Sequence, residues 1–210
     1  MMNSAADVDL WEVTLGKVFS SIEPNHREFL LRQRVFFNAS AGARGRVNVS
    51  PKDGKSLRVL DENSVAYLDL TGSGNETAAH LRDNGRVTLM FCAFEGPPLI
   101  LRLYGQGRVV RRESPEYESL LRTHFGSEEP PGARQMIVLA VERVQTSCGY
   151  NVPLYQYSGE RDTLLRWAEK KGPDGLAEYR RKKNTRSIDG LPTGLLDGDT
   201  TEASANSVAR

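Results

Sequence analysis

The segment that decides the fold is residues 86–110, which read RVTLMFCAFEGPPLILRLYGQGRVV. Residues 86–94 and 99–110 have the length of strands and are rich in β-branched and aromatic side chains, which favours extended structure. Between them stands Glu95-Gly96-Pro97-Pro98, whose glycine and prolines are typical of a turn. Gly105 and Gly107, inside the second strand, predict a bulge, a sharp bend or the close approach of a ligand. The segment therefore predicts two long strands joined by a tight turn.

Further strands are predicted on both sides of this segment. Apolar or alternating runs bounded by turn residues occupy residues 35–40, 47–50, 57–60, 64–70 and 135–145. Helices are predicted over residues 20–33, 76–84 and 115–125. Because six or more strands occur without a regular strand–helix alternation, a closed antiparallel barrel is favoured over a parallel sheet. Side chains fill so small a barrel, so a ligand is expected on its outside or at an interface.

The composition excludes several classes of protein. The 210 residues include 28 Lys and Arg against 27 Asp and Glu, so the chain lacks the excess of positive charge that is typical of a nucleic-acid-binding protein. No run approaches the roughly 20 apolar residues of a membrane span, and the N-terminus does not resemble a secretory signal. Cys92 and Cys148 form no disulfide or zinc-binding pattern, and the three histidines lack the spacing of a metal site. We expect a cytoplasmic protein that binds no metal, nucleic acid or membrane.

Polar side chains share one face of the strand predicted near residues 46–52. By the two-residue period of a strand, this face carries Arg46, Asn48, Ser50 and Lys52. Two cations, an amide and a hydroxyl could bind a polyanionic ligand, because Arg and Lys suit phosphate. A solvated strand face explains the same pattern equally well.

The loop Gly72-Ser73-Gly74-Asn75-Glu76-Thr77 is a second candidate, because it leads from a strand into a helix. Backbone N–H groups and the side chains of Ser73, Asn75 and Thr77 could converge there on an anion. Glu76 has the wrong charge to stand beside a phosphate, and a plain helix cap is the simpler interpretation.

Taken in order, the segments resemble the pyridoxamine 5′-phosphate oxidase-like family of FMN-binding split barrels. The resemblance spans roughly residues 23–144 and is carried by NVSPK (48–52), VAYLD (65–69), TAAHLRDN (77–84), RVTLMF (86–91) and LRLYGQG (101–107). SCGYNVP (147–153) and SIDGLP (187–192) resemble an uncharacterised branch of bacteria and fungi. The resemblance implies a mainly β fold with flanking helices, built on a six-stranded antiparallel split barrel. It also implies a homodimer with FMN in a groove between two barrels.

The resemblance further implies which residues bind the cofactor. The strand near residues 46–52 would contact the flavin ring through its backbone and the phosphate through its basic side chains. The end of the strand 64–70 would lie along the isoalloxazine, and the loop before the next helix would take the phosphate. The implied set is Arg46, Val47, Asn48, Val49, Ser50, Lys52, Tyr67, Leu68, Asp69, Asn75 and Thr77. The family's Ser-Arg-Lys triplet falls on Asn75-Glu76-Thr77, so Arg46 and Lys52 would carry more of the phosphate charge.

The function implied is that of a flavin-dependent oxidoreductase acting on an unknown small-molecule substrate. Oxidation of pyridoxamine phosphate itself is disfavoured, because the arginine and histidine that hold that substrate have no counterpart near residues 161–167. The alternative is a non-catalytic protein that binds a flavin, a deazaflavin or haem. Tyr150 is the residue to test as an acid or base, with a purely structural role as the other interpretation.

Three segments are expected along the chain. Residues 1–158 would form the barrel with its N-terminal helix, residues 159–196 a helical C-terminal extension packed on the barrel, and residues 197–210 a disordered tail. The extension contains two short predicted helices, 161–170 and 175–183, and a compact turn, 187–192. The turn would either form a wall of the substrate site or help to cap the barrel.

Overall fold

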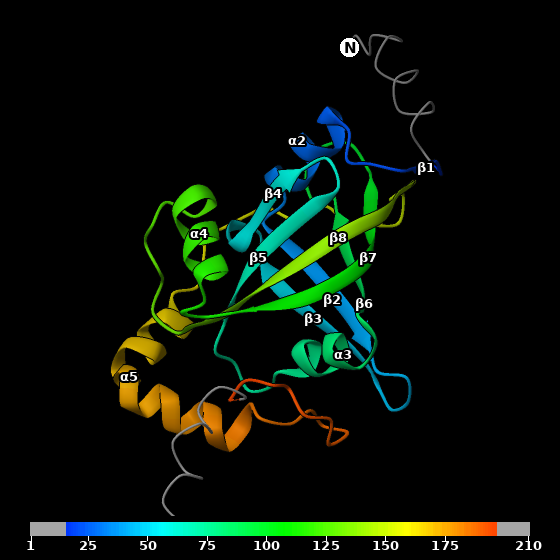
Figure 1. Cartoon of the computed structure of the whole chain (residues 1–210). Coiled ribbons are helices and arrows are strands. Elements are labelled where there is room, and N and C mark those ends of the chain that lie inside the picture. The colour runs from blue at the N-terminus through cyan, green and yellow to red at the C-terminus, as the bar shows by residue number, and fades with distance from the viewer. Residues whose placement is uncertain (1–15, 197–210) are drawn as a thin grey trace, which may run out of the picture.

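Eight strands form one antiparallel sheet in the computed structural model, which describes residues 16–196 (Figure 1). The tail predicted to be disordered lies outside the described residues. The strands are β1 (Val18–Phe19), β2 (Val35–Ala41), β3 (Val47–Asp53), β4 (Leu57–Asp61), β5 (Ser64–Leu70), β6 (Arg86–Cys92), β7 (Ile100–Arg111) and β8 (Ala133–Ser147). Their order across the sheet is β3-β2-β6-β7-β8-β5-β4, and β1 pairs with β8. The predicted antiparallel, mainly β fold is confirmed.

The sheet is split rather than closed. In the part of the chain that the structure describes, β3 pairs with β2 and β4 pairs with β5, but β3 and β4 do not pair with each other. Pro51 lies within β3 and has no N–H to donate to a second neighbour, which suits a strand at the edge. The expectation of a closed barrel was therefore wrong. The split barrel that the resemblance implies is confirmed, although its sheet in residues 16–196 has eight strands rather than six. Seven of them correspond to strand ranges predicted from the sequence, and the two-residue β1 does not.

The predicted irregularity in the second strand of the central pair is a β-bulge. The register between β7 and β8 shifts between Tyr104 and Gly105. A Cβ atom at Gly105 would lie 1.9 Å from the carbonyl oxygen of Ala140, so only glycine permits this approach. The glycine thus serves the bend of the sheet, which is one of the roles that its position predicted.

In the described residues, four α-helices surround the sheet. Helices α2 (Pro24–Arg32) and α3 (Glu76–Asn84) lie at opposite ends of it, and α4 (Pro115–His124) lies beside β5 and β8 (Figure 1). Helix α5 (Thr163–Lys183) is interrupted at Gly172, where φ is 65°, and Pro173 follows. The break separates two helical parts near the two ranges that the sequence predicts. None of the helices in residues 16–196 is long and apolar enough to cross a membrane.

The core has two parts, one on each side of β5. Val65 and Tyr67 point into the barrel, where Tyr67 packs edge-on against Phe36 with ring centroids 5.5 Å apart. Ala66 and Leu68 point outward into a smaller cluster with Tyr117 of α4. Because both faces of β5 are covered, the strand is apolar from Val65 to Leu68, and Asp69 near its end is a buried charged residue.

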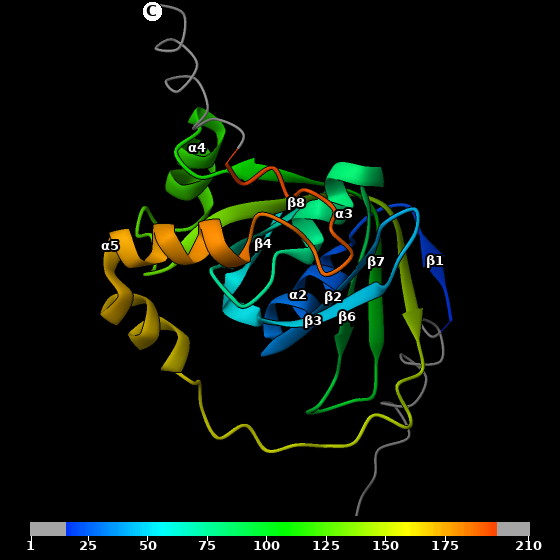
Figure 2. The same cartoon turned by 90° about the horizontal axis from the view of Figure 1, so that it is seen from below.

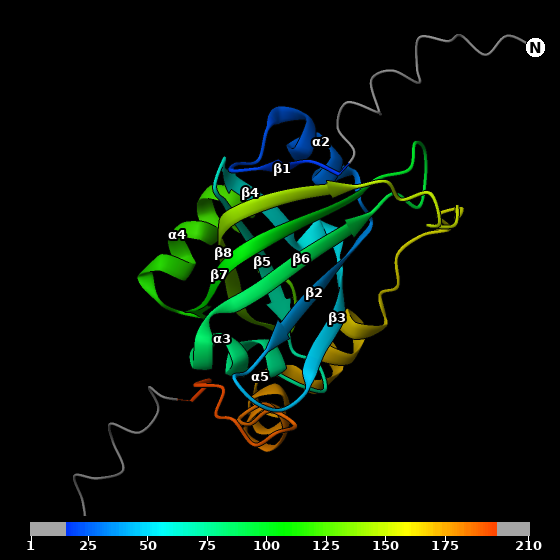
Figure 3. The same ribbon diagram turned by 90° about the vertical axis from the view of Figure 1, so that its right-hand side faces the viewer.

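The chain after β8 leaves the sheet and returns to it. The connection to α5 has no helix or strand and runs along one side of the molecule (Figure 2). Helix α5 and the segment after it then lie below the end of the sheet that carries α3 (Figures 1 and 3). Arg180 of α5 fixes this position, donating to the hydroxyl oxygen of Thr71 at 2.8 Å and to the carbonyl oxygen of Ala133 at 2.7 Å. These contacts bring C-terminal residues next to the loop before α3.

Candidate functional site

A groove of about 950 Å³ lies between the sheet and the C-terminal segment. Its walls are β3, the end of β5, the loop before α3, and residues at both ends of α5. Seven of the eleven residues predicted to bind the cofactor line it, namely Asn48, Ser50, Lys52, Leu68, Asp69, Asn75 and Thr77. The structure thus gathers on one surface side chains that are up to 29 positions apart in the sequence.

The other four predicted residues do not line the groove. Val47 and Val49 are 71% and 58% exposed, because their side chains alternate with the groove-facing residues of β3. Tyr67 is buried in the core of the barrel. The guanidinium of Arg46 is held by Asp189 of the C-terminal turn rather than by the groove.

Asp69 is the centre of the charged part of the groove. Its carboxylate accepts hydrogen bonds from Lys52 at 2.7 Å, from Arg134 at 2.6 Å and from Gln135 at 2.9 Å. Burial alone would raise the pKa of Asp69, but the positive charges of Arg134 and Lys52 outweigh it and hold the pKa well below its usual value. Asp69 therefore stays ionised at neutral pH and pairs with both cations beside it, which leaves the three side chains with one net positive charge.

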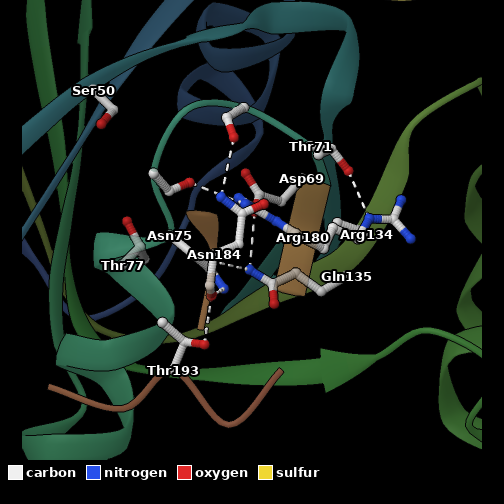
Figure 4. A network of polar contacts seen from close by, with 12 residues as sticks. Ser50, Asp69, Thr71, Asn75, Thr77, Arg134, Gln135, Arg180, Asn184 and Thr193 are labelled. Atoms are coloured by element: carbon white, nitrogen blue, oxygen red, sulfur yellow. Dashed lines mark hydrogen bonds and ion pairs between the residues drawn. The ribbon is translucent and has the colours of Figure 1, made fainter. Parts of the chain in front are cut away.

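A second polar network joins the loop before α3 to β8 and to the C-terminal segment (Figure 4). The side-chain oxygen of Asn75 accepts from Gln135 at 2.8 Å, and its amide donates to the carbonyl oxygen of Asn184 at 3.3 Å. The Asn184 amide donates to the carbonyl oxygen of Gly72 at 3.1 Å, and Thr193 donates to the Asn184 carbonyl at 2.7 Å. The Asn75 side chain is thereby engaged on both of its polar atoms.

Thr77 is held from the other side. Its hydroxyl oxygen accepts a hydrogen bond from the buried Asn38 amide at 2.6 Å. Thr77 is in the first turn of α3, where helix N–H groups lack partners within the helix. Together with Asn75, it makes this end of the groove a rigid, hydrogen-bonded surface.

The opposite end of the groove, near the start of α5, is basic. Lys55, Arg58 and Arg161 line it, and Arg58 donates to the carbonyl oxygen of His124 at 2.7 Å while it stacks on Phe125. Lys55 pairs with Glu160 at 3.4 Å, but both side chains are substantially exposed, so water screens this pair. Leu164 and Leu165 add apolar surface beside these cations.

No side chain of the groove is arranged as an obvious acid or base among the residues described. Asp69 is fixed as a carboxylate, and burial, with the nearby Asp69 charge, raises the pKa of Tyr67 well above its usual value. Tyr150, the residue singled out from the sequence, is 68% exposed and does not line the groove. Within residues 16–196, no three His, Cys, Asp or Glu side chains gather to hold a metal ion.

Several residues of the site were missed by sequence reasoning. They are Arg134 and Gln135 of β8 and the C-terminal residues Arg180 and Asn184. A signal existed for Arg134, because an aspartate at the end of an apolar strand needs a buried cation as its partner. Asn184 lies 109 positions from its partner Asn75 in the sequence, and no local sequence pattern predicts a contact between residues so far apart.

The residues of this site suit a flavin ring better than they suit a terminal phosphate. The volume and the mixture of apolar and hydrogen-bonding walls are those of a pocket for a small aromatic ligand. The end near α3 does not fit a phosphate in the way expected, because Lys52 is paired with Asp69 and Arg46 with Asp189. Asn75 and Thr77 are already bonded to protein groups. The residues therefore fit the ring and do not fit the phosphate at that end.

Comparisons with known proteins give one consistent result. The family model described as pyridoxamine 5′-phosphate oxidase matches residues 22–148. The chain is 42% identical over 190 residues to the pyridoxamine 5′-phosphate oxidase family protein ustO of Aspergillus flavus, which covers 83% of this chain and 76% of that protein. A variant of HupZ from Group A Streptococcus has a similar crystal structure, with a TM-score of 0.50, 23% identity and coverage of 60% of this chain and 98% of that one. The streptococcal likeness shows the fold, and the matches in sequence show that this chain belongs to the pyridoxamine 5′-phosphate oxidase family.

Proposed function

We propose that the groove binds a flavin and that the protein is a flavin-dependent oxidoreductase acting on a small-molecule substrate. The observation that carries the proposal is that Asn48, Ser50, Leu68 and Asp69, from strands β3 and β5, line the same groove. These residues offer amide and hydroxyl groups for a ring edge and an apolar side chain for a ring face. Membership of the family supports the same ligand class.

The protein's own part in such a reaction is binding and orientation. When bound, the flavin supplies the hydride or electron transfer, and the protein tunes it through nearby charge and hydrogen bonds. Asp69, fixed between Lys52 and Arg134, gives the groove a carboxylate that does not change its charge near neutral pH. Leu68 and Leu165 contribute apolar surface to the lining of the groove.

The specific expectations from the sequence are FMN as the flavin and a homodimer as the assembly. Val47 and Val49 support the dimer, because both are largely exposed on a strand at the end of the sheet and immediately beside the groove. A second copy placed there would bury them and would narrow the groove. An isologous two-fold pair is the commonest arrangement for such an assembly.

A non-catalytic flavin-binding protein is the second candidate. One observation favours it: the ionisable groups at the centre of the groove, Asp69, Lys52 and Arg134, are paired with one another. Groups held in such pairs suit the binding and positioning of a ligand, and Asp69 stays ionised near neutral pH rather than acting as an acid. Both candidates bind a flavin. Only the first of them would catalyse a reaction with it.

Two measurements on the purified full-length chain test the proposal. The first is the absorbance spectrum after incubation with excess flavin and removal of unbound ligand, and we expect a retained flavin spectrum. The second is anaerobic reduction of the bound flavin by NADH or NADPH, followed by re-oxidation with an acceptor. Retention with reduction and re-oxidation supports the oxidoreductase, whereas retention without reduction by either donor supports the non-catalytic protein. A chain that retains no flavin contradicts both.

A further inference from the structure

The Glu76 carboxylate occupies the space in front of the first turn of α3. Its Oε2 atom accepts a hydrogen bond from the backbone N–H of Ile188 at 2.9 Å. Its Oε1 atom lies 3.2 Å from where a Cβ atom of Gly74 would be, so the side chain folds back over the glycine loop. The partial positive charge of the helix N-terminus, which could attract a ligand anion, thus already faces a carboxylate of the chain.

The turn that carries Ile188 is attached firmly at this place. The Ser187 N–H donates to the carbonyl oxygen of Leu191 at 2.9 Å, and the Leu191 N–H donates to the Ser187 hydroxyl oxygen at 3.0 Å. Asn184, immediately before the turn, is fully buried against Gly72. The turn is therefore a built wall of the groove, and Ser187 and Ile188 line it.

Asp189 of the same turn binds the Arg46 guanidinium, so that the positive charge of Arg46 does not face the groove. Its carboxylate accepts the backbone N–H of Arg46 at 2.7 Å and pairs with the Arg46 guanidinium. Gly45 allows this contact, because a Cβ atom there would lie 2.5 Å from the Asp189 Oδ2 atom. The backbone N–H of Arg46, together with its guanidinium, holds the pKa of Asp189 below its usual value, so the residue is ionised at neutral pH.

The charges near α3 therefore disfavour a ligand phosphate. Asp69 offsets one of the two positive charges of Lys52 and Arg134, Asp189 offsets that of Arg46, and Glu76 adds a further carboxylate, so these six side chains together carry no net formal charge. Lys183 and Arg186 also line the groove, but both are exposed to water, which screens their charge. A phosphate monoester carries close to two negative charges at neutral pH and would meet this carboxylate at close range.

We infer that Glu76 and Asp189 determine ligand specificity at the end of the groove near α3, and that this end takes the side chain of a flavin that ends in a hydroxyl in preference to one that ends in a phosphate. The inference rests on the proposed flavin-binding function and names the ligand class for the same groove. A terminal hydroxyl can donate a hydrogen bond to the Glu76 carboxylate. A phosphate monoester with two negative charges has only acceptor oxygens and repels the carboxylate. Riboflavin and FMN differ only in this group, so they form a matched pair of probes.

The experiment measures the dissociation constants of riboflavin and FMN by quenching of flavin fluorescence on the full-length chain. We expect riboflavin to bind at least about tenfold more tightly than FMN, which corresponds to about 1.4 kcal/mol. Glu76→Gln keeps the shape and an acceptor for the Ile188 N–H but removes the charge. We expect it to shift the affinity ratio about tenfold toward FMN.

Asp189→Asn provides a second test, because it releases the Arg46 guanidinium and should shift the ratio in the same direction. Glu118→Gln on the exposed face of α4 is the control for net charge and should leave the ratio unchanged. If wild-type protein binds FMN more tightly than riboflavin, or if neither Glu76→Gln nor Asp189→Asn moves the ratio, the inference is wrong while flavin binding stands. If neither flavin binds, the proposed function itself is overturned.

Discussion

Asp69 is the residue on which the groove depends, because it holds two cations and an amide on a single buried carboxylate. Removing one partner of a buried ion pair leaves an uncompensated charge, which costs about 3–5 kcal/mol in folding free energy. Asp69→Asn would leave Arg134, itself almost fully buried, without its anion. We expect a loss of unfolding free energy of about that size in urea denaturation. Asp174→Asn, at an exposed position of α5, is the matched control and should change stability by less than about 0.5 kcal/mol.

The same carboxylate predicts a pH dependence of stability. The pKa of Asp69 is lowered in the folded chain, so its contribution is fully present above the unfolded value of about 4 and is lost as the pH falls below that value. The difference in unfolding free energy between wild type and Asp69→Asn should therefore be constant from pH 8 to pH 5 and should shrink below pH 4. A difference that stays constant down to pH 3 would contradict the assignment.

For single residues, the sequence predicts the face of a strand on which a side chain lies better than it predicts the partner that the side chain contacts. The alternation along β3 correctly places Asn48, Ser50 and Lys52 on one face, because side chains of a strand alternate by geometry alone. Arg46 belongs to the same alternation, yet the structure pairs it with Asp189. That partner lies 143 positions away, and its proximity depends on how the C-terminal segment packs.

Among the elements, the C-terminal turn after α5 has the most specific attachment to the site. Asn184 is fully buried and links this segment to the loop before α3 through Gly72 and Asn75. Its contacts explain why the turn lies at the groove rather than elsewhere on the barrel.

Asn184→Ala removes the hydrogen bond to Gly72 and leaves a small cavity, so we expect a loss of about 1–3 kcal/mol in unfolding free energy. Hydrogen exchange of the amides of Ser187, Leu191 and Thr193 should accelerate, because each of these N–H groups is bonded within this segment. Asn151→Ala, at an exposed position in the connection after β8, should have neither effect. Unchanged exchange in Asn184→Ala would show that the turn is held by other contacts.

The elements themselves were largely predictable. Each strand range predicted between residues 35 and 145 corresponds to a strand, since apolar alternation and turn residues act locally. The two-residue β1 has no such pattern, and its pairing with β8 depends on tertiary contact. The strand count alone favoured a closed barrel, because closure is a property of the whole sheet, whereas the resemblance to the family correctly predicted a split one.

For the whole molecule, the exposed valines of β3 predict an assembly. We expect the wild-type chain to sediment as a dimer at micromolar concentration, with Val47 and Val49 buried in the contact. Val47→Lys combined with Val49→Lys should yield a monomer, because two charges would have to be buried in the contact. Val18→Lys is the matched control, since Val18 of β1 is also exposed, at 55%, but lies away from β3 in the sheet. A wild-type monomer, or a dimer that persists in the double variant, would contradict this assembly.

The central claim is that the groove walled by β3, β5 and the loop before α3 binds a flavin, and calorimetric titration with riboflavin tests it most directly. Ser50→Trp places a large side chain on the groove wall, whereas Ser119→Trp places the same side chain at an exposed position of α4. We predict saturable binding of one riboflavin per chain to wild type and to Ser119→Trp, and at least about hundredfold weaker binding to Ser50→Trp. Riboflavin binding that Ser50→Trp leaves unchanged, or no binding to the wild-type chain, would contradict the claim.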